Sequence, residues 1–530
     1  MFSQVVETDQ QNALVRQLIA NPGGLGAGQD SVEHIETHIS HLLLAGDFVY
    51  KIKKPVNLGF LDFSTLEKRR LCCEEEVRLN RRLAPALYVG VVGIGGDVDQ
   101  PEVIESGEPL EYAVKMRRFR QEDLLDRQML ERDTIDELAR LIADFHQTAE
   151  VCSNPEYTAV ETILKPMRDN FQTLRALKQP LLHVERLNRL QTWLDQQALQ
   201  HQTLLEERAE SGRIRECHGD LHLGNITRFE GRITPFDGIE FNPELRWIDT
   251  LNDLAFLLMD LQYRGMNAAS SRLLNQYLAC TGDYAGLPLL SLYQCYRAMV
   301  RAKVHAIRAF QPGLSAQSQK AQLEEYQQYI ELAEELTRHP PASLTLTHGL
   351  SGSGKTTVSD WMSEQLMAIR LRSDVERKRL FPNTRDGKDG DSAQRYSEAA
   401  NRTTYAHLSG QAKHLLQAGY SVIVDAAFLK QWQRTLFLEM ARRLGVPVLI
   451  VDCHARDETL EARVLRRSQA GEDASEADLS VLELQRRSCE QLNPEEQSRV
   501  VRVETESFPP QGFMATLLQR FMQADRDLHP

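Results

Sequence analysis

The sequence predicts two folding units of different class, an α+β unit with two lobes followed by an α/β unit built on a parallel sheet. Its 530 residues exceed what one hydrophobic core usually organises. The segment TRHPPAS, Thr337 to Ser343, ends a polar helical pattern with two adjacent prolines, which cannot continue a helix. After this break, buried-strand patterns alternate with helical patterns, which is typical of parallel sheets. We therefore predict domains at residues 1–340 and 341–530.

The composition excludes some classes of partner. With 42% hydrophobic and 26% charged residues, the chain resembles an ordinary soluble globular protein. Its formal net charge of -13 opposes general binding to nucleic acid or to anionic lipid. We expect no nucleic acid and no membrane among its partners.

The sequence also favours a cytoplasmic location. The first residues, MFSQVVETDQQNALV, lack the basic segment and apolar run of a signal peptide. No apolar run approaches the roughly 18–20 residues that would span a bilayer. The eight cysteines are scattered without metal-ligand spacing, as expected for reduced thiols.

The segment from Val32 to Lys53 predicts two or three strands, VEHIE, ISHLLLAG and DFVYKIK. In the last of these, Lys51 and Lys53 alternate onto one face of the strand. A lysine in this position can meet the α- and β-phosphates of a nucleotide. The simpler interpretation is a pair of solvated lysines near a strand end.

A helix is predicted over LEKRRLCCEEEVRLNRRLA, Leu66 to Ala84, with Leu79 and Leu83 on its buried stripe. Glu76 precedes these leucines by three and seven residues, which suits an inward-facing carboxylate that could hold a strand lysine. Glu75 is the alternative partner. A solvated acidic run is the simpler interpretation.

The stretch HGDLHLGN, His218 to Asn225, has the H-x-D-x-x-x-x-N spacing of the protein-kinase catalytic loop. In that loop the aspartate handles the proton of the attacking hydroxyl, and the asparagine holds magnesium. Asp237, in ITPFDGIEF, follows Asn225 by twelve residues and supplies the second oxygen ligand that a magnesium site requires. The expected constellation is therefore Asp220, Asn225 and Asp237.

The order of these motifs resembles the aminoglycoside phosphotransferase family, kinase-like proteins that phosphorylate small molecules. The segments that carry the resemblance are DFVYKIK, EEEVRLN, HGDLHLGN, PFDGIEF and WIDTLNDLAFLLMDL. The resemblance covers roughly residues 30 to 310 and implies a bilobal, protein-kinase-like fold. It implies that Asp220 is the base or hydroxyl-orienting group and that Asn225 and Asp237 bind magnesium. Lys51 would then bind phosphate, with Glu76 holding it.

The same resemblance implies supporting roles for further residues. His218 would brace the catalytic loop, and Ser40 corresponds loosely to the serine of the family's nucleotide loop. Asp249 and Asp253 resemble a structural segment of the family and are not assigned to the site.

The second unit opens with GLSGSGKT, which matches the Walker A pattern G-x-x-x-x-G-K-S/T in full, between strand-like LTLTH and a helix-like run. Glycines let backbone N–H groups approach phosphates, Lys355 meets the β- and γ-phosphates, and Thr356 offers a hydroxyl to Mg²⁺. The expected nucleotide site comprises Gly349, Ser351, Gly352, Ser353, Gly354, Lys355, Thr356 and Thr357.

Two carboxylates follow at the ends of predicted strands. Asp374, in MAIRLRSDVERKRL, ends a second strand, where a carboxylate can receive a hydroxyl proton. A capping box of Ser373 and Glu376 is a simpler interpretation, and both can hold. Asp425 ends a third strand, in GYSVIVD, and is the Walker B candidate for arranging magnesium-bound water.

Arg463, Arg466 and Arg467 are spaced to share one helix face before the loop AGEDASEAD. This pattern resembles the arginine-bearing lid of nucleoside-monophosphate-type kinases, where cations neutralise charge on the transferring phosphoryl group. We assign Arg466 to catalysis on this basis. A solvated basic face is the alternative.

The second unit as a whole resembles P-loop kinases of the gluconate kinase, chloramphenicol phosphotransferase and zeta-toxin group over most of residues 343 to 505. Both units together resemble a family described as bifunctional aminoglycoside phosphotransferase/ATP-binding protein.

These observations favour a phosphotransferase with two sites for ATP and Mg²⁺, which phosphorylates a hydroxyl of a small molecule. One alternative is a regulatory protein in which one nucleotide site senses ATP for the other site or for a partner. Another is a toxin-like kinase of nucleotide sugars.

Overall fold

The computed structural model describes residues 2–528 except 27–30, 58, 60, 98, 339, 383–396 and 471–477. It divides into two compact units. Unit 1 comprises Met1–Asp260 and Tyr296–Ile330, and unit 2 comprises Leu261–Cys295 and Glu331–Pro530. Unit 2 thus includes a segment that precedes the Pro340–Pro341 break, and the boundary near residue 340 stays a prediction.

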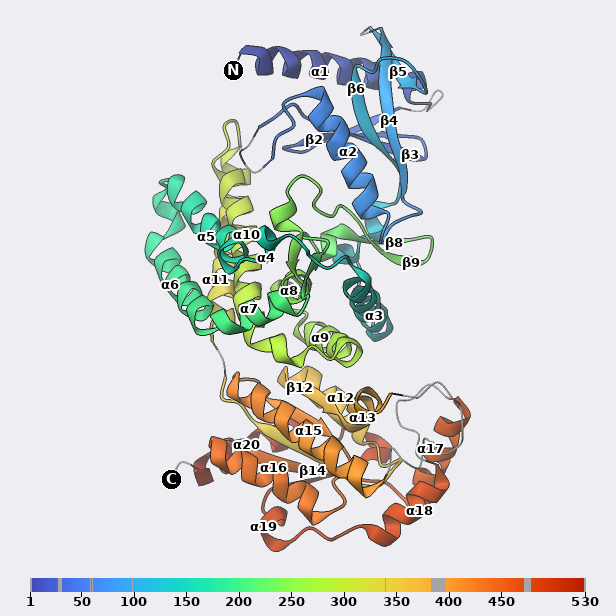
Figure 1. The fold of residues 1–530 in the computed structure, drawn as a ribbon, viewed down its shortest axis with the longest axis vertical. Helices are drawn as coiled ribbons and strands as arrows, with labels where there is room; N and C mark the ends of the chain where they lie inside the picture. Colours follow the sequence, from blue (N-terminus) through green and yellow to red (C-terminus); the bar gives the residue numbers. More distant parts are fainter. Residues whose placement is uncertain are drawn as a thin grey trace. The chain divides into compact units, whose positions relative to one another are not determined.

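Unit 1 begins with a small lobe, which consists of helices α1 and α2 and a six-stranded antiparallel sheet in the order β1-β2-β3-β6-β4-β5 (Figure 1). The expected strands between residues 32 and 53 are confirmed as β1 to β3. The strands of the sheet are β1 (Glu33–Glu36), β2 (Ser40–Ala45), β3 (Phe48–Lys53), β4 (Tyr88–Asp97), β5 (Gln100–Ile104) and β6 (Glu111–Arg117).

The two faces of this sheet are covered by different helices. Helix α1 (Phe2–Ala20) packs against the face that carries Tyr50 and Ile52. Helix α2 (Leu66–Asn80) covers the other face and ends before the expected Ala84. Because side chains alternate along β3, the packing of Tyr50 and Ile52 toward α1 turns Lys51 and Lys53 toward α2.

The large lobe of unit 1 is mainly helical, and its two short antiparallel strand pairs flank the predicted catalytic loop. HGDLHLGN lies between β7 and β8, and Asp237 follows β9 by two residues. The strand pairs are β7 (Ile214–Glu216) with β10 (Trp247–Asp249), and β8 (Ile226–Phe229) with β9 (Arg232–Pro235). The helices are α3 (Arg132–Thr148), α4 (Pro155–Thr158), α5 (Val160–Ala176), α6 (Val184–Gln200), α7 (Gln202–Glu210), α8 (Thr250–Tyr263), α10 (Leu290–Ala309) and α11 (Ala316–Leu336), of which α8, α10 and α11 continue into unit 2.

Unit 2 is an α/β fold on a five-stranded sheet in the order β12-β13-β11-β14-β15, in which every neighbouring pair is parallel. The predicted fold classes of both halves are thus confirmed. Its strands are β11 (Leu344–His348), β12 (Ile369–Arg372), β13 (Val422–Asp425), β14 (Val448–His454) and β15 (Val500–Glu504). Its helices are α9 (Asn267–Thr281), α12 (Lys355–Leu366), α13 (Ser373–Leu380), α15 (Glu398–Gln417), α16 (Gln431–Leu444), α17 (Asp457–Ala470), α18 (Leu479–Ser488), α19 (Pro494–Gln497) and α20 (Phe513–Leu528).

Helix α9 covers the edge of this sheet. Asn275 donates a hydrogen bond to the carbonyl of Ala368 (3.0 Å) and accepts one from the N–H of Arg370 (2.7 Å). Ser271 donates to the carbonyl of Ser363 on α12 (2.7 Å). The Asn275 side chain therefore replaces part of a neighbouring strand along the outer edge of β12.

Among the helices of the described residues, none combines the length and the apolar character that crossing a membrane would require.

Arg434, on α16, is a fully buried charge that joins α16 to the segment before β15. Its Nε lies 2.8 Å from Glu496 Oε1, and Nη1 donates to the carbonyl of Phe428 (2.9 Å). A buried carboxylate that loses its only charged partner must be neutralised or left uncompensated.

Arg434→Ala is therefore expected to destabilise unit 2 by about 3–5 kcal/mol, because it leaves Glu496 buried without a cation. Scanning calorimetry of the full chain measures the effect. Arg443→Ala removes an exposed arginine of the same helix, with a side chain 76% exposed, and should change stability by less than about 0.5 kcal/mol. Equal shifts for both variants would contradict the assignment.

Two candidate nucleotide sites

A network of buried charges joins the small lobe of unit 1 to the segment after β9. Lys51 Nζ lies 2.9 Å from Glu76 Oε1 and 2.6 Å from Asp237 Oδ1. Lys53 Nζ lies 2.6 Å from Glu76 Oε2 and also pairs with Glu240. Lys53 and Glu76 are buried, whereas the Asp237 side chain is 43% exposed. Asp237 is thus the member of the network that can reach a ligand.

The network keeps Lys51 and Glu76 charged at neutral pH. Burial alone would raise the pKa of Glu76, but Lys51 and Lys53 lower it to about 2. Burial alone would lower the pKa of Lys51, but Asp237 and Glu76 raise it well above its usual value. Lys51 therefore presents a fixed positive charge beside the exposed carboxylate of Asp237.

Of the two candidate glutamates, the structure brings Glu76 to Lys51. Glu75 instead lies 2.7 Å from Arg78 and 2.7 Å from Arg246. The inward position of Glu76 agrees with its spacing from Leu79 on α2.

The predicted catalytic loop brings Asp220 and Asn225 together. Asn225 Nδ2 donates to Asp220 Oδ2 (2.9 Å) and to the Asp220 carbonyl (3.0 Å), which turns the amide oxygen away from Asp220. His222 Nε2 lies 3.5 Å from Asp220 Oδ2. Burial alone would raise the pKa of Asp220, but His222, together with Arg301 and His218, lowers it below its usual range. Asp220 is therefore an ionised hydrogen-bond acceptor at neutral pH.

Asp253, which the sequence assigned to structure, holds this loop. Its carboxylate accepts hydrogen bonds from the N–H groups of His218 (3.0 Å) and Gly219 (2.8 Å), and it lies 3.1 Å from His146 Nε2. His218 Nε2 in turn lies 2.9 Å from the carbonyl of Phe236. The loop is thereby fixed from α8 on one side and from the Asp237 segment on the other.

Two more side chains, those of Arg297 and Asp260, support the loop. Arg297 Nη1 donates to the carbonyl of Gly219 (2.9 Å), and Asp260 accepts from the N–H of Leu223 (2.9 Å). Gly219 has φ +84°, and a Cβ there would lie 2.7 Å from the carbonyl oxygen of Leu245. The second residue of HGDLHLGN must therefore be glycine.

Asp237 is also held through its backbone, by residues that sequence reasoning missed. It adopts φ +60°, and its N–H donates to the hydroxyl of Tyr88 (3.1 Å). The N–H of Gly238 donates to Asn80 Oδ1 (2.8 Å). Tyr88, Asn80 and the Lys53–Glu240 pair have no local motif that would reveal them, because their partners are distant in sequence.

In unit 2 the Walker A loop runs from β11 into α12. Gly352 has φ +81° and Gly354 φ +85°, and a Cβ at either position would come within 3.0 Å of a neighbour, the Leu460 carbonyl oxygen and Thr505 respectively. These glycines therefore permit the tight loop that exposes backbone N–H groups.

Lys355 begins α12 at the end of this loop. Its Nζ donates to the carbonyl of Leu350 (2.7 Å), and burial lowers its pKa. Gln485, from α18, accepts a hydrogen bond from the N–H of Ser351 (2.8 Å) and was not expected from the sequence.

Most of the expected residues of unit 2 surround one pocket. Asp374 and Asp425 both line it, although Asp374 lies in the first turn of α13 rather than at the end of β12. Asp425 Oδ2 is buried without a hydrogen bond, and the Nε of Arg372 is 4.0 Å away. The lining residues are Ser351, Gly352, Gly354, Lys355, Thr356, Thr357, Arg372, Ser373, Asp374, Asp425, Ala426, Ala427, Arg463, Arg467, Val481 and Gln485.

Two expected loop residues, Gly349 and Ser353, support the loop from outside this lining. Gly349 has φ +139°, and a Cβ there would lie 2.6 Å from Ser353 Oγ. The Ser353 carbonyl accepts a hydrogen bond from the Thr505 hydroxyl (2.9 Å).

The capping box expected at Ser373 and Glu376 is wrong. The helix begins at Ser373 with Arg372 as the N-cap, and no side chain caps it. Glu376 is buried and pairs with Arg379 and with His407 (3.0 Å). Its carboxylate is thus directed into the fold.

The three arginines of α17 have different surroundings. Arg463 donates to the carbonyls of Gly352 (3.1 Å) and Thr505 (2.9 Å), so it stabilises the Walker A loop. Arg467 lines the pocket, whereas Arg466 is exposed and is not among the lining residues. The geometry favours Arg467 over Arg466, whose catalytic role stays a prediction. The expected lid loop lies largely outside the described residues, at 471–477.

Comparison with known proteins finds two family models that match separate parts of the chain. Residues 65–290 match the model of the phosphotransferase enzyme family, and residues 344–492 match that of an AAA domain. The chain carries a phosphotransferase-family domain and a P-loop domain. The phosphotransferase and P-loop resemblances are thereby confirmed, and the enzyme class is that of kinases and phosphotransferases. The phosphotransferase match includes helix α9, which belongs to unit 2 together with the P-loop domain.

Relatives extend over both domains. The chain is 29% identical over 449 residues to "Uncharacterized protein Rv2004c" of Mycobacterium tuberculosis and, equally, to "Uncharacterized protein Mb2027c" of Mycobacterium bovis, covering 83% of this chain and 87% of each relative. Among solved structures, amicoumacin kinase hAmiN in complex with AMP-PNP, Ca²⁺ and Ami is 15% identical, with 62% of this chain and 96% of that chain covered and a TM-score of 0.38. A gluconokinase from Sinorhizobium meliloti is 22% identical, with 36% and 95% covered and a TM-score of 0.24. These structural likenesses are too weak to assign an activity.

Glu76→Gln is expected to destabilise the phosphotransferase domain by roughly 3 kcal/mol at pH 7, because Lys51 and Lys53 lose the negatively charged carboxylate with which both are paired. The pKa of Glu76 is lowered from 4.5 to about 2, so its contribution is complete above pH about 4.5 and is lost as the pH falls toward 2. The difference in unfolding free energy between wild type and variant, measured by urea denaturation, should therefore shrink between pH 5 and pH 2.5.

Glu75→Gln is the matched control, because this half-exposed neighbour does not contact Lys51. It should lose much less stability at pH 7. A loss as large as that of Glu76→Gln would remove Glu76 from its role.

Proposed function

We propose that this protein is an ATP- and Mg²⁺-dependent phosphotransferase with two nucleotide sites, and that the phosphotransferase domain transfers phosphate to a hydroxyl of a small molecule. The observation that carries the proposal is the position of Lys51 Nζ between Glu76 and Asp237. A lysine held in this way can neutralise phosphate charge, and the adjacent exposed carboxylate can bind a cation. The proposal includes no nucleic acid or membrane partner.

The contacts of Asp220, Asn225 and His218 in the catalytic loop suggest a role for each. Asp220 is ionised and can accept the proton of the acceptor hydroxyl, or orient that hydroxyl for attack. Asn225 is oriented by its hydrogen bonds to Asp220, with its amide oxygen directed away. His218 and Asp253 hold the loop, so that Asp220 need not reorganise when substrate binds.

The residues fit magnesium in both domains. In the phosphotransferase domain, Asp237 and Asn225 offer the oxygen ligands that Mg²⁺ prefers. In the P-loop domain, the buried Asp425 oxygen that makes no hydrogen bond and the hydroxyl of Thr356 are suited to the ion or to its water. The bound ion would neutralise charge on the phosphate oxygens.

In the P-loop domain, Asp374 is proposed to accept a hydroxyl proton across the pocket from Lys355. The backbone of Gly349 to Thr357 would cradle the phosphates, and Arg467, or Arg466 as the sequence predicts, would stabilise developing charge. A cytoplasmic location stays a prediction from the sequence.

The decisive experiment incubates the purified full chain with fractionated metabolite extract and γ-labelled ATP, and identifies the labelled product. Each site is inactivated separately, by Asp220→Ala or Lys355→Ala. Nucleotide binding without transfer by either domain would favour the regulatory alternative, and a labelled nucleotide sugar would favour the toxin-like one.

Asp220→Ala is expected to lower phosphoryl transfer by the phosphotransferase domain roughly 10²–10⁴-fold, with ATP affinity changed only a few-fold, because the group acts in chemistry rather than in nucleotide binding. Initial rates of product formation and calorimetric ATP titration measure the two effects. Asp97→Ala, which removes an exposed carboxylate of β4, is the control. An unchanged rate for Asp220→Ala would exclude the proposed role.

Lys355→Ala should abolish ATP binding by the P-loop domain and leave transfer at Asp220 in place, because the two sites have separate phosphate-binding groups. Coupling between the sites would typically alter the surviving activity by about 5–150-fold. Calorimetry should find two ATP per chain in wild type and one in either Lys355→Ala or Lys51→Ala. One ATP in wild type and none in either variant would require a single composite site instead.

A further inference from the structure

Three potential metal ligands gather on the hairpin formed by β1 and β2 in the small lobe. The antiparallel register places Glu36 opposite His41 and His34 opposite Leu43, so His34, Glu36 and His41 share one face. One ligand atom from each residue lies within 4.8 Å of the other two. None of these three residues is among those assigned to the nucleotide sites above.

The rings of the two histidines are hydrogen-bonded to each other and lie close to the spacing of two ligands of one ion. His34 Nε2 lies 3.0 Å from His41 Nδ1, and the ring centroids are 5.2 Å apart. Two nitrogens bound to a tetrahedral zinc at about 2.0–2.1 Å would lie about 3.3 Å apart. A small opening of this pair would admit an ion between the rings.

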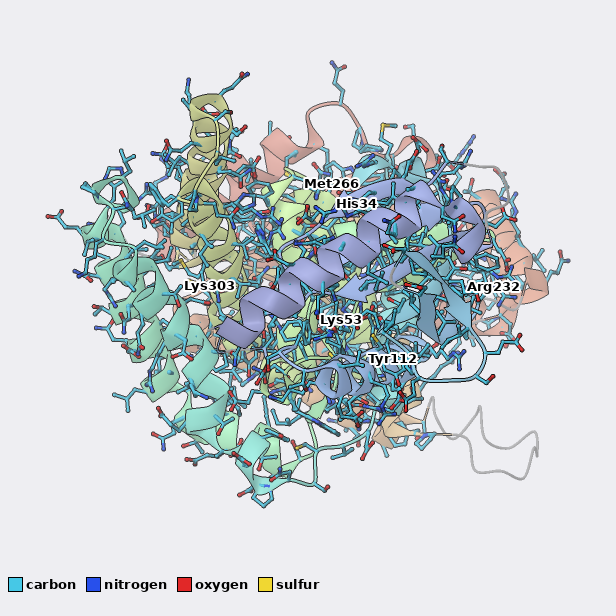
Figure 2. All side chains as sticks on the ribbon, turned by 90° about the horizontal axis from the view of Figure 1, so that it is seen from above. His34, Lys53, Tyr112, Arg232, Met266 and Lys303 are labelled. Atoms are coloured by element: carbon cyan, nitrogen blue, oxygen red, sulfur yellow. The ribbon has the colours of Figure 1, made fainter. Side chains whose placement is uncertain are left out.

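The cluster combines a fixed ligand with accessible ones. His41 is only 3% exposed, and its Nε2 makes no hydrogen bond. His34 and Glu36 are exposed, and His34 can be located in Figure 2. The buried ring is held in position while the other two side chains can close on an ion from solvent.

Two existing contacts compete with such an ion, the hydrogen bond between the two rings and the ion pair of Glu36 with Lys54. Lys54 Nζ lies 2.6 Å from Glu36 Oε1 and 2.6 Å from the carbonyl of Thr37. Because the Glu36 side chain is 58% exposed, its ion pair with Lys54 contributes little and can be exchanged for a metal bond.

We propose that His34, Glu36 and His41 form a binding site for a divalent transition metal, and that Zn²⁺ is the ion this ligand set fits best. Two imidazoles and one carboxylate match zinc coordination, and the fourth position is left to water. Mg²⁺ and Ca²⁺ prefer oxygen ligands alone, so the nucleotide-bound magnesium would not substitute.

The site lies on the opposite face of the sheet from the phosphate lysine. His41 is paired with Ile52, which packs toward α1, whereas Lys51 faces α2. A bound ion would tie β1, an edge strand with all four residues exposed, to β2. The expected consequence is a more rigid hairpin.

Zinc binding is tested by calorimetric titration of the full chain with ZnCl₂ at pH 7.5, without nucleotide. Wild type should bind one more Zn²⁺ than His34→Ala or Glu36→Gln, or bind it at least about tenfold more tightly. Both substitutions are at exposed positions, so the fold should survive, which circular dichroism can check. Replacement of Zn²⁺ by Co²⁺ should give the visible absorption of a tetrahedral site in wild type alone.

His38→Ala is the matched control, because His38 is an exposed histidine of the same hairpin that is outside the cluster. It should bind zinc as wild type does. Equal zinc stoichiometry and affinity in wild type, His34→Ala and Glu36→Gln would overturn the proposal. A loss of binding in His38→Ala as large as in His34→Ala would overturn the assigned ligand set.

Discussion

The ammonium groups of Lys51 and the buried Lys53 share the carboxylate of Glu76, and this sharing constrains the rest of the phosphotransferase domain. A buried charge without a partner costs several kcal/mol, so β3 and α2 must meet in one register. A shift of β3 by one residue would place Tyr50 and Ile52 against Glu76 and turn both lysines toward α1. The sheet register is thus fixed by apolar packing on one face and by charge pairing on the other, and Asp237 is positioned relative to Lys51 as a result.

The P-loop domain would bind the phosphates of a nucleotide through a different arrangement of groups. The groups proposed to bind phosphate there are backbone N–H donors exposed by glycines with positive φ, and Lys355 is held on the carbonyl of Leu350. Burial lowers the pKa of Lys355, whereas the carboxylates around Lys51 raise the pKa of that lysine. The phosphotransferase domain therefore carries its own counter-charges, while the P-loop domain relies on the phosphate to provide them.

Local patterns predicted much of this arrangement, because the motifs are short and their geometry is set by neighbouring residues. The alternation of Lys51 and Lys53 and the helical spacing of Glu76 predicted the faces on which these side chains lie, while Glu75 and a pair of solvated lysines stayed open as alternatives. The contacts that support the catalytic loop were harder to predict from the sequence, because Asp253 lies 35 residues after His218 and no spacing rule links the two. The assignment of Arg466 stays a prediction, because helical spacing identifies a shared face of α17 but does not show which arginine of that face lines the pocket.

The contacts of Asn275 at the edge of β12 limit where the chain can be divided. This residue lies within the part that matches the phosphotransferase family, yet its amide occupies the N–H of Arg370 and the carbonyl of Ala368 in the P-loop domain. A protein beginning at residue 341 would leave that edge open to a strand from another molecule, which is a known route to aggregation. The two domains therefore cannot be separated cleanly at the proline pair. A gene divided there would separate the P-loop sheet from Asn275, the side chain that covers the edge of β12.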